Sequence, residues 1–367
     1  MGLVRTVMRV VARASRLGIA LCAGAAVCVS AAAAPAQVTL AAATESSTVK
    51  PVIQGLIDRH GPPPANMLGT VDAYVVAVNW SDIQPTAFGP IVEGNAIDEA
   101  ITRVRQPDFA AVGMTLKIRV FAGINAPDWA KNLGGAPVPF EDTQAGEVTP
   151  PGTTIGRFWT PEFGAAYDDV ENKLAALYDT VPEIREVTVS RCSTIYDELF
   201  VRELSDKNNA AALKAAGYTT EADKQCIDDA ISEHDVWQHT TSDIDVSPFP
   251  TPSDPTGSHD LPFTTSMMSW CRDQLGIRCG LENNALSAGK LKNALFQQLY
   301  AAMTALGPPI TLQTSVITRM GRSQVVLPAG VQIGANSIEL PAGFVNFPKT
   351  VLQAANQNLI ANPLPGA

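Results

Sequence analysis

Strand-like and helix-like segments alternate along most of this chain, and this alternation restricts its possible folds more than any other feature. Runs rich in apolar and β-branched residues occupy 74–80, 116–123, 186–190, 242–247, 277–281, 310–316 and 337–341, with a weaker one at 136–142. Helical spacing is found at 97–112, 161–177, 220–237, 262–275 and 288–306. Strands that alternate with helices form parallel sheets, because each helix returns the chain to the same edge.

Eight such strands predict a (β/α)8 TIM barrel built as a single domain over residues 71–367. Residues 37–70 are expected to form a leader with a short helix near Val52–Arg59. A doubly wound open sheet is the alternative fold. No GxGxxG follows the first strand and no GxxxxGK[ST] occurs, so a nucleotide-binding sheet lacks its usual motifs.

Residues 1–36 have the composition of a secretory signal peptide. Four arginines precede an apolar stretch from Leu17 to Ala34, and either Ala32-Ala33-Ala34 or Ala34-Pro35-Ala36 offers a small-x-small cleavage site. An uncleaved N-terminal anchor is the alternative. No later stretch approaches the roughly 18 apolar residues of a transmembrane helix. The chain from Gln37 onward is therefore predicted to be secreted, without a membrane span.

The predicted mature chain is strongly acidic. Four of the 26 basic residues and none of the 36 acidic residues lie in 1–36, which leaves 22 basic groups and a net charge of −14. Such a chain is a poor partner for nucleic acid or an anionic membrane. A neutral ligand such as a carbohydrate is the easiest to reconcile with this charge.

Four of the six cysteines follow the predicted signal peptide, and an even number in an exported protein favours disulfides. The spacing suggests two local bridges, Cys192–Cys226 and Cys271–Cys279, although three connectivities are possible. There is no CxxC, and no His-x-x-x-His pair among the four histidines. Neither a metal site nor a cofactor is expected.

Catalytic residues of such barrels lie at the carboxyl ends of the strands. Polar and aromatic residues occupy these positions along this chain: Asn79, Trp80, Asp82, Gln84, Asn125, Asp128, Trp129, Arg157, Phe158, Trp159, Arg191, Tyr196, Asp197, Glu198, Asp243, Asp245, Glu282, Asn283, Asn284, Gln313, Ser315 and Glu339. Carboxylates and amides bind sugar hydroxyls, while indole rings offer apolar faces to sugar C–H groups. Each Trp taken alone could equally be a core or rim aromatic.

Two segments carry a resemblance to a known family. Residues 80–85, Trp-Ser-Asp-Ile-Gln-Pro, are similar to the Trp-x-x-x-(Gln/Glu)-Pro motif that ends the first strand of (β/α)8 glycoside hydrolases of the β-galactosidase-like and related retaining families. Residues 123–129 resemble the Gly-x-x-x-Pro-x-Trp segment after the next strand. The likeness covers roughly residues 70–200, and it implies a barrel that acts on a carbohydrate.

The chain departs from those families at the catalytic positions. They place Asn-Glu at the end of the fourth strand, where this chain has Ser190-Arg191, and a nucleophilic Glu on the seventh, where this chain has no acid. We therefore assign Glu198 as general acid/base and Glu282 as the second carboxylate, with Glu339 as its substitute. Glu339 could instead pair with Arg119 inside the barrel.

Five residues are expected to line the sugar sites: Trp80, Asp82, Trp129, Trp159 and Asn283. Asp243 and Asp245 alternate on one strand, so both face the same side of the sheet, and ordinary hydrogen bonding is expected of them.

The sequence thus supports a secreted glycoside hydrolase-like protein that cleaves glycosidic bonds with two carboxylates. The alternative is a non-catalytic secreted barrel that binds a glycan or a cell-surface partner. A catalyst needs two carboxyl groups within about 10 Å across one cleft, whereas a binder needs only the aromatic residues. A lyase or isomerase would need a Lys or His base, for which no candidate is evident.

Overall fold

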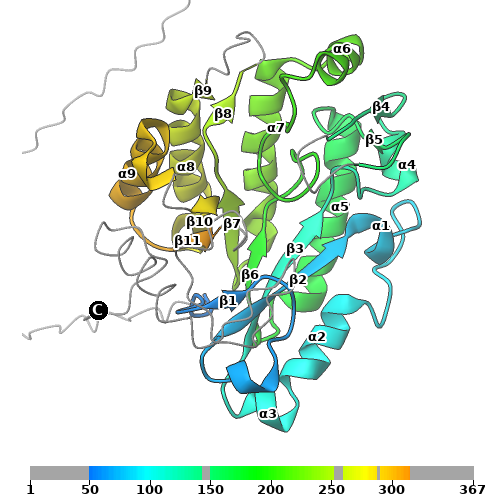
Figure 1. Ribbon diagram of the computed structural model, residues 1–367. Coiled ribbons are helices and arrows are strands. Elements are labelled where there is room, and N and C mark those ends of the chain that lie inside the picture. The colour runs from blue at the N-terminus through cyan, green and yellow to red at the C-terminus, as the bar shows by residue number, and fades with distance from the viewer. Residues whose placement is uncertain (1–48, 143–148, 252–258, 287–289, 315–367) are drawn as a thin grey trace, which may run out of the picture. The chain divides into compact units, whose positions relative to one another are not determined.

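The computed structural model describes residues 49–142, 149–251, 259–286 and 290–314. The predicted signal peptide, Glu339 and the predicted strand at 337–341 lie outside these residues. Seven strands form one parallel sheet (Figure 1): β1 (Ile57–Asp58), β2 (Ala73–Asn79), β3 (Thr115–Phe121), β6 (Ile184–Thr188), β7 (Thr241–Asp245), β10 (Cys279–Leu286) and β11 (Ile310–Thr314).

The order of the strands in the sheet is their order in the chain, and all neighbouring pairs are parallel. A doubly wound sheet reverses its strand order at a switch point, and this one does not. The open-sheet alternative is therefore excluded for the described residues. Sequential parallel order is the topology of an α/β barrel.

The sheet is curled, because side chains from distant strands meet. Arg119 Nη1 on β3 donates to Gln313 Oε1 on β11 over 2.8 Å. In a flat sheet these two strands, four spacings apart, would be separated by about 19 Å. Lys117 on β3 likewise lies 2.6 Å from Glu282 on β10. The described strands thus form most of an α/β barrel, with these charged groups inside it.

Helices follow the strands on the outer face of the sheet: α2 (Ala96–Val104), α3 (Pro107–Ala110), α5 (Pro161–Tyr178), α7 (Thr220–Glu233), α8 (Leu261–Leu275) and α9 (Ala294–Leu306). The helix α6 (Lys207–Ala215) instead packs beside Glu141, and the single turns α1 (Trp80–Ile83) and α4 (Asp128–Lys131) follow β2 and β3. Thr160 caps α5 and Pro161 is its first residue, as the sequence predicts. The helix expected at 97–112 is two helices, because Pro107 starts a new one.

Alternation along the strands separates an apolar outer face from a charged interior. On β3, Leu116, Ile118 and Val120 join the hydrophobic core between sheet and helices, whereas Lys117 and Arg119 point inward. The same alternation holds on β7, where Ile244 lies in the core. Barrel interiors are usually filled by branched apolar side chains. The charged interior of this barrel is therefore a feature that needs a physical explanation.

The N-terminal segment differs from its prediction. No helix forms at Val52–Arg59; residues 57–58 pair with β2 as strand β1 instead. Lys50 Nζ donates to the carbonyls of Val181 and Ile184, and Ile53 N donates to Glu186 Oε1. These contacts hold the segment extended across the amino ends of β6 and β7.

The weaker strand predicted at 136–142 also lies outside the barrel. Val138–Pro139 forms β4, whose partner among the described strands is β5 (Thr154–Ile155), in a small antiparallel ribbon. A second such ribbon is made by β8 (Phe249–Pro250) and β9 (His259–Asp260). Among the described helices, none is both long and apolar enough to cross a membrane.

Lys117→Ala should lower the free energy of unfolding by about 3–5 kcal/mol, because removal of one partner from a buried ion-pair cluster leaves uncompensated carboxylates. Urea titration of the wild type and the variant measures this loss. Arg105→Ala is the control, since the Arg105 side chain is 53% exposed in its pair with Glu183 and exposed pairs contribute about 0–1 kcal/mol. Equal losses in both variants would contradict the role given to Lys117.

Candidate active site

Lys117 occupies the lower part of the barrel interior. Its Nζ lies 2.7 Å from Asp243 Oδ2, 2.6 Å from Glu282 Oε2 and 3.5 Å from Glu186 Oε2. Burial alone would lower the pKa of Lys117, but the charges of Asp243, Glu282 and Glu186 outweigh it and raise this pKa above its usual value. Lys117 is therefore a permanent cation that ties β3 to β6, β7 and β10.

Arg119 extends the same charge network toward the carboxyl ends of the strands. Its Nε lies 2.9 Å from Asp197 Oδ2, and its Nη2 donates to Glu282 Oε1. Both oxygens of Glu282 are thus ion-paired, one to Arg119 and one to Lys117. Burial would raise the pKa of Glu282, but these two cations overcome it and lower the pKa. Glu282 is therefore held ionised.

Three carboxyl groups meet above Arg119: Asp197 and Glu198 in the loop after β6, and Asp245 at the end of β7. One oxygen from each lies within 4.8 Å of the others. Glu198 forms a parallel bridge with Asp245, and Leu199 N donates to the Asp245 carbonyl over 3.2 Å. This backbone pairing places Glu198 beside Asp245, much as a further strand residue would be placed.

The carboxyl groups of Glu198 and Asp245 differ in exposure but share an electrostatic environment. Asp245 is completely buried, whereas the Glu198 side chain is 14% exposed. Burial, with the charge of Asp197 added, raises the pKa of Glu198 to about 7. Burial, together with Glu198, Asp197 and Glu282, raises the pKa of Asp245 well above its usual value. Two carboxyls this close do not both ionise near neutral pH, so the pair holds a proton.

Three oxygens of this cluster are buried without a hydrogen bond among the described residues, and one of them, Asp197 Oδ2, is ion-paired with Arg119. Glu198 Oε2 and Asp245 Oδ1 are buried and accept no hydrogen bond from the part of the chain that the structure describes. Asp245 Oδ2 accepts one from Asn284 Nδ2. Buried polar atoms normally have partners, so Glu198 Oε2 and Asp245 Oδ1 are each expected to carry a proton or to contact a ligand.

The same carboxylates have the chemistry of ligands for a hard cation such as Ca²⁺. However, Arg119 already brings a positive charge to Asp197 at 2.9 Å. A proton held by the Glu198–Asp245 pair, together with this guanidinium, offsets most of the negative charge of the cluster. An acid–base site is therefore the simpler interpretation of the arrangement.

Trp80, expected to stack against a sugar, lies in the core. It has no exposed surface and packs edge-on against Trp129, Phe163 and Tyr167 at centroid distances of 5.5–5.8 Å. Its Nε1 donates to Gln84 Oε1 over 2.9 Å. In this conformation the indole has no face that a sugar could contact, because α5 covers it.

Three other expected sugar-binding residues lie outside the strands: Asp82 in α1, Trp129 in α4 and Trp159 just before α5. Trp129 is partly buried, donates from Nε1 to Gln84 O and packs against the exposed Phe88. Asp82 is exposed and accepts a hydrogen bond from the side chain of Asn79, and Trp159 packs edge-on against Phe158 and Tyr218. Trp129 thus lies against Trp80, whereas the ring contacts of Trp159 are with Phe158 and Tyr218.

Asn283 lies on the opposite face of β10 from Glu282. Its Nδ2 donates to Val246 O, and its Oδ1 accepts from the Tyr300 hydroxyl of α9. Because residues alternate along a strand, Glu282 and Asn284 face the interior while Asn283 faces the helices. The amide that reaches the carboxylate cluster is therefore Asn284, one position beyond the predicted residue.

The sequence placed Asp245 and Asn284 at strand ends and Arg119 inside the barrel, but it did not indicate that these three residues contact one another. A signal was present: Lys117 and Arg119 alternate on one predicted strand, and Asp243 and Asp245 alternate on another. Charges at alternate positions on two strands of one barrel indicate paired groups inside it.

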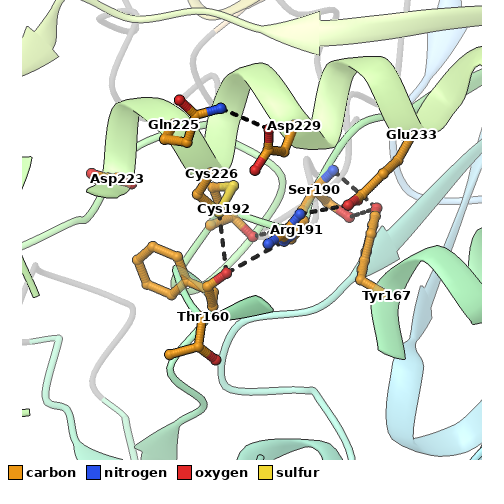
Figure 2. The surroundings of a disulfide bond; sticks show 12 residues. Thr160, Tyr167, Ser190, Arg191, Cys192, Asp223, Gln225, Cys226, Asp229 and Glu233 are labelled. Carbon is orange, nitrogen blue, oxygen red and sulfur yellow. Dashed lines mark hydrogen bonds and ion pairs between the residues drawn. A yellow bond between two sulfur atoms is a disulfide. The ribbon is translucent and has the colours of Figure 1, made fainter. Parts of the chain in front are cut away.

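Two disulfides are formed, with the connectivity that the spacing suggested. Cys192–Cys226 joins the loop after β6 to α7, and Cys271–Cys279 joins α8 to the start of β10. Figure 2 shows Arg191 beside the first bridge, pointing toward Glu233 on α7, and the two side chains lie 2.6 Å apart. Tyr167 of α5 bonds to Ser190 in the same group. The loop that carries Glu198 is therefore anchored where it leaves the sheet.

Comparison with solved structures finds distant likenesses. The catalytic domain of β-amylase from Paenibacillus polymyxa has a TM-score of 0.47 and 10% identity, covering 82% of this chain and 89% of that chain. Endo-glycoceramidase II from Rhodococcus sp. has a TM-score of 0.36 and 12% identity, covering 72% of each chain. An old yellow enzyme homologue from Zymomonas mobilis has a TM-score of 0.38 and 13% identity, covering 75% of this chain and 79% of that chain.

No protein-family model and no curated protein matches the sequence. Since all three TM-scores lie below 0.5, these likenesses assign neither the fold nor an activity. Strand order and register define the fold of the described residues.

The Cys192→Ala/Cys226→Ala double variant should lose more stability than Cys271→Ala/Cys279→Ala. The first bridge closes a separation of 34 residues and the second one of 8. Loop-closure entropy then predicts a difference of about 1 kcal/mol between the two losses. Denaturant unfolding of both variants without reductant measures it, and a larger loss for the shorter loop would contradict this account.

Proposed function

We propose that this protein is a secreted, glycoside hydrolase-like barrel that cleaves glycosidic bonds with Glu198 and Asp245. The observation that carries the proposal is the proximity of their carboxyl oxygens, within 4.8 Å, at the carboxyl end of the sheet. Retaining glycosidases hold their two carboxyl groups roughly 5–5.5 Å apart. Such a spacing favours direct attack by one carboxylate over activation of an intervening water.

Glu198 is the proposed acid/base because it is the more exposed of the two carboxyls, and its pKa near 7 lets it hold a proton at neutral pH. The mechanism requires the shared proton to lie on Glu198 when the sugar binds, which leaves Asp245 as the carboxylate. Glu198 protonates the leaving glycosidic oxygen while Asp245 bonds to the anomeric carbon. Glu198 then removes a proton from water, whose oxygen displaces Asp245 and returns it to a carboxylate.

Asp245 replaces Glu282 as the second carboxylate in this proposal. Both oxygens of Glu282 are engaged by Lys117 and Arg119, so neither is free to attack a sugar. Glu282 instead keeps Arg119 in position beneath the carboxylate cluster. Glu339, the other candidate from the sequence, lies outside the described residues.

The remaining properties of the chain fit a glycan outside the cytoplasm. Two disulfides are typical of oxidising compartments, which supports secretion. The net charge of −14 after residue 36 favours a neutral substrate over an anionic one. Asp82, Trp129 and Trp159 are the residues proposed to contact sugar units beyond the cleaved bond.

The test is sugar release by the protein from Gln37 onward, given polysaccharides and aryl glycosides. Glu198→Gln and Asp245→Asn should each lower kcat/KM by about 10²-fold or more, because each removes a carboxyl that the reaction requires. Glu183→Gln is the matched control, since Glu183 pairs with Arg105 away from the site, and it should retain activity.

Three results would change the assignment. Full activity in Asp245→Asn with none in Glu282→Gln would return the role of second carboxylate to Glu282. Full activity in Glu198→Gln would remove Glu198 from the mechanism. Glycan binding without release by any of the proteins would support the non-catalytic barrel instead.

The rate should fall above about pH 7, because Glu198 acts in its protonated form and its pKa is raised to about 7. Asp197→Asn removes a charge that raises this pKa, so the alkaline limb of the kcat/KM profile should move to lower pH. The pH profiles of kcat/KM for the wild type and Asp197→Asn on one aryl glycoside measure this shift. An alkaline limb that is identical in both would show that another group supplies the proton.

A further inference from the structure

We propose that Asn284 is a positioning residue for Asp245, and that Arg119 sets the orientation in which Asn284 acts. This inference rests on the proposed function, since it concerns the carboxylate that would attack the sugar. The contacts that carry it run from β3 through β10 to β7: Arg119 to Asn284, and Asn284 to Asp245.

The chemistry of the two neighbours leaves Asn284 a single orientation. A guanidinium has only donors, so the amide oxygen must face Arg119, whose Nη2 lies 3.4 Å from Asn284 Oδ1. The amide NH₂ then faces Asp245 and donates to its Oδ2. With the amide reversed, NH₂ would oppose guanidinium and oxygen would oppose carboxylate.

This orientation decides which oxygen of Asp245 remains available. Oδ2 is engaged by Asn284, and Oδ1 accepts no hydrogen bond from the described residues. Glu198 Oε2 is in the same condition. Asn284 therefore fixes the Asp245 carboxyl so that the free oxygen is the one left for the proton or the substrate.

A second amide on the same guanidinium provides a matched comparison. Gln313 Oε1 on β11 accepts from Arg119 Nη1 over 2.8 Å. Like Asn284 it is partly buried and faces the barrel interior, but no bond joins it to Asp245. Changing either amide to its carboxylic acid places a similar new charge beside Arg119, and only the change at Asn284 removes a donor from Asp245.

Charged groups face Asp245 from three directions. Asp197 and Glu198 approach from the loop after β6, Arg119 from β3 and Glu282 from β10. On the outer side of the sheet, burial and then the charge of Asp245 raise the pKa of Tyr300 on α9. None of these groups is altered in the variants compared below.

Asn284→Asp should lower kcat about 10- to 100-fold with KM little changed, because a donor to a charged group is lost at the reacting carboxylate. Gln313→Glu should stay within about threefold of the wild type on the same scale. If Asn284 had a purely structural role, Asn284→Asp would lower kcat no more than Gln313→Glu does. Aspartate has the same shape as asparagine and pairs more strongly with Arg119.

A second readout does not depend on hydrolysis. In protein labelled with ¹³C at aspartate carboxyls, the Asp245 signal is the one missing from Asp245→Asn. Its titration midpoint should move up by about one pH unit or more in Asn284→Asp, because the lost hydrogen bond stabilised the ionised form. Asn284→Ala removes the donor without adding charge and should move it in the same direction, which covers the case in which Asn284→Asp does not fold.

The two readouts separate the inference from the proposed function. Absence of sugar release by the wild type would reject the hydrolase, while the titration would still decide the role of Asn284. An Asp245 midpoint unchanged in both Asn284 variants, or shifted equally in Gln313→Glu, would overturn the inference.

Discussion

Two cations on strand β3 link the charged groups inside this barrel. Lys117 and Arg119 reach carboxyl groups on β6, β7, β10 and the loop after β6. Buried charges are stable only when they are paired, so these contacts require the sheet to curl until distant strands face one another. Among the described residues, the interior holds more carboxyl groups than cations, and raised pKa values favour protons on the excess carboxyls. A site rich in acid is therefore a consequence of how the sheet is closed.

The helices and the strand order could largely be predicted, because both depend on local pattern. The Thr160-Pro161 start of α5 and the alternation of β3 are visible in single stretches of sequence. Strand β1 could not be predicted, since its two residues carry no apolar run and form a strand only by pairing with Ala73 and Tyr74. Its extended path depends on partners more than 100 residues away, such as Glu186.

The sequence indicated one carboxylate of the proposed site but not the residues around it. Glu198 could be chosen because it is an acid after a strand, and Asp245 was seen to share a face with Asp243. Nothing local indicates that Asp245 meets Glu198 or that Asn284 reaches it, because these contacts depend on how far the sheet curls. The prediction that Trp80 contacts a sugar is not supported for a related reason. An aromatic residue after a strand has the same sequence signature whether it faces the barrel mouth or α5.

The contacts of Arg119 join residues far apart in the sequence, and this separation affects the order in which parts of the chain fold. Arg119 bonds to Gln313 across 194 residues and to Glu282 across 163. Contacts this distant in sequence form late, since the loop between them must first be closed. A chain that has emerged from a ribosome or an export channel only as far as β7 contains both Glu198 and Asp245, yet it lacks the strands that anchor Arg119 and carry Asn284. The arrangement of this site is thus completed only when nearly the whole described chain has folded.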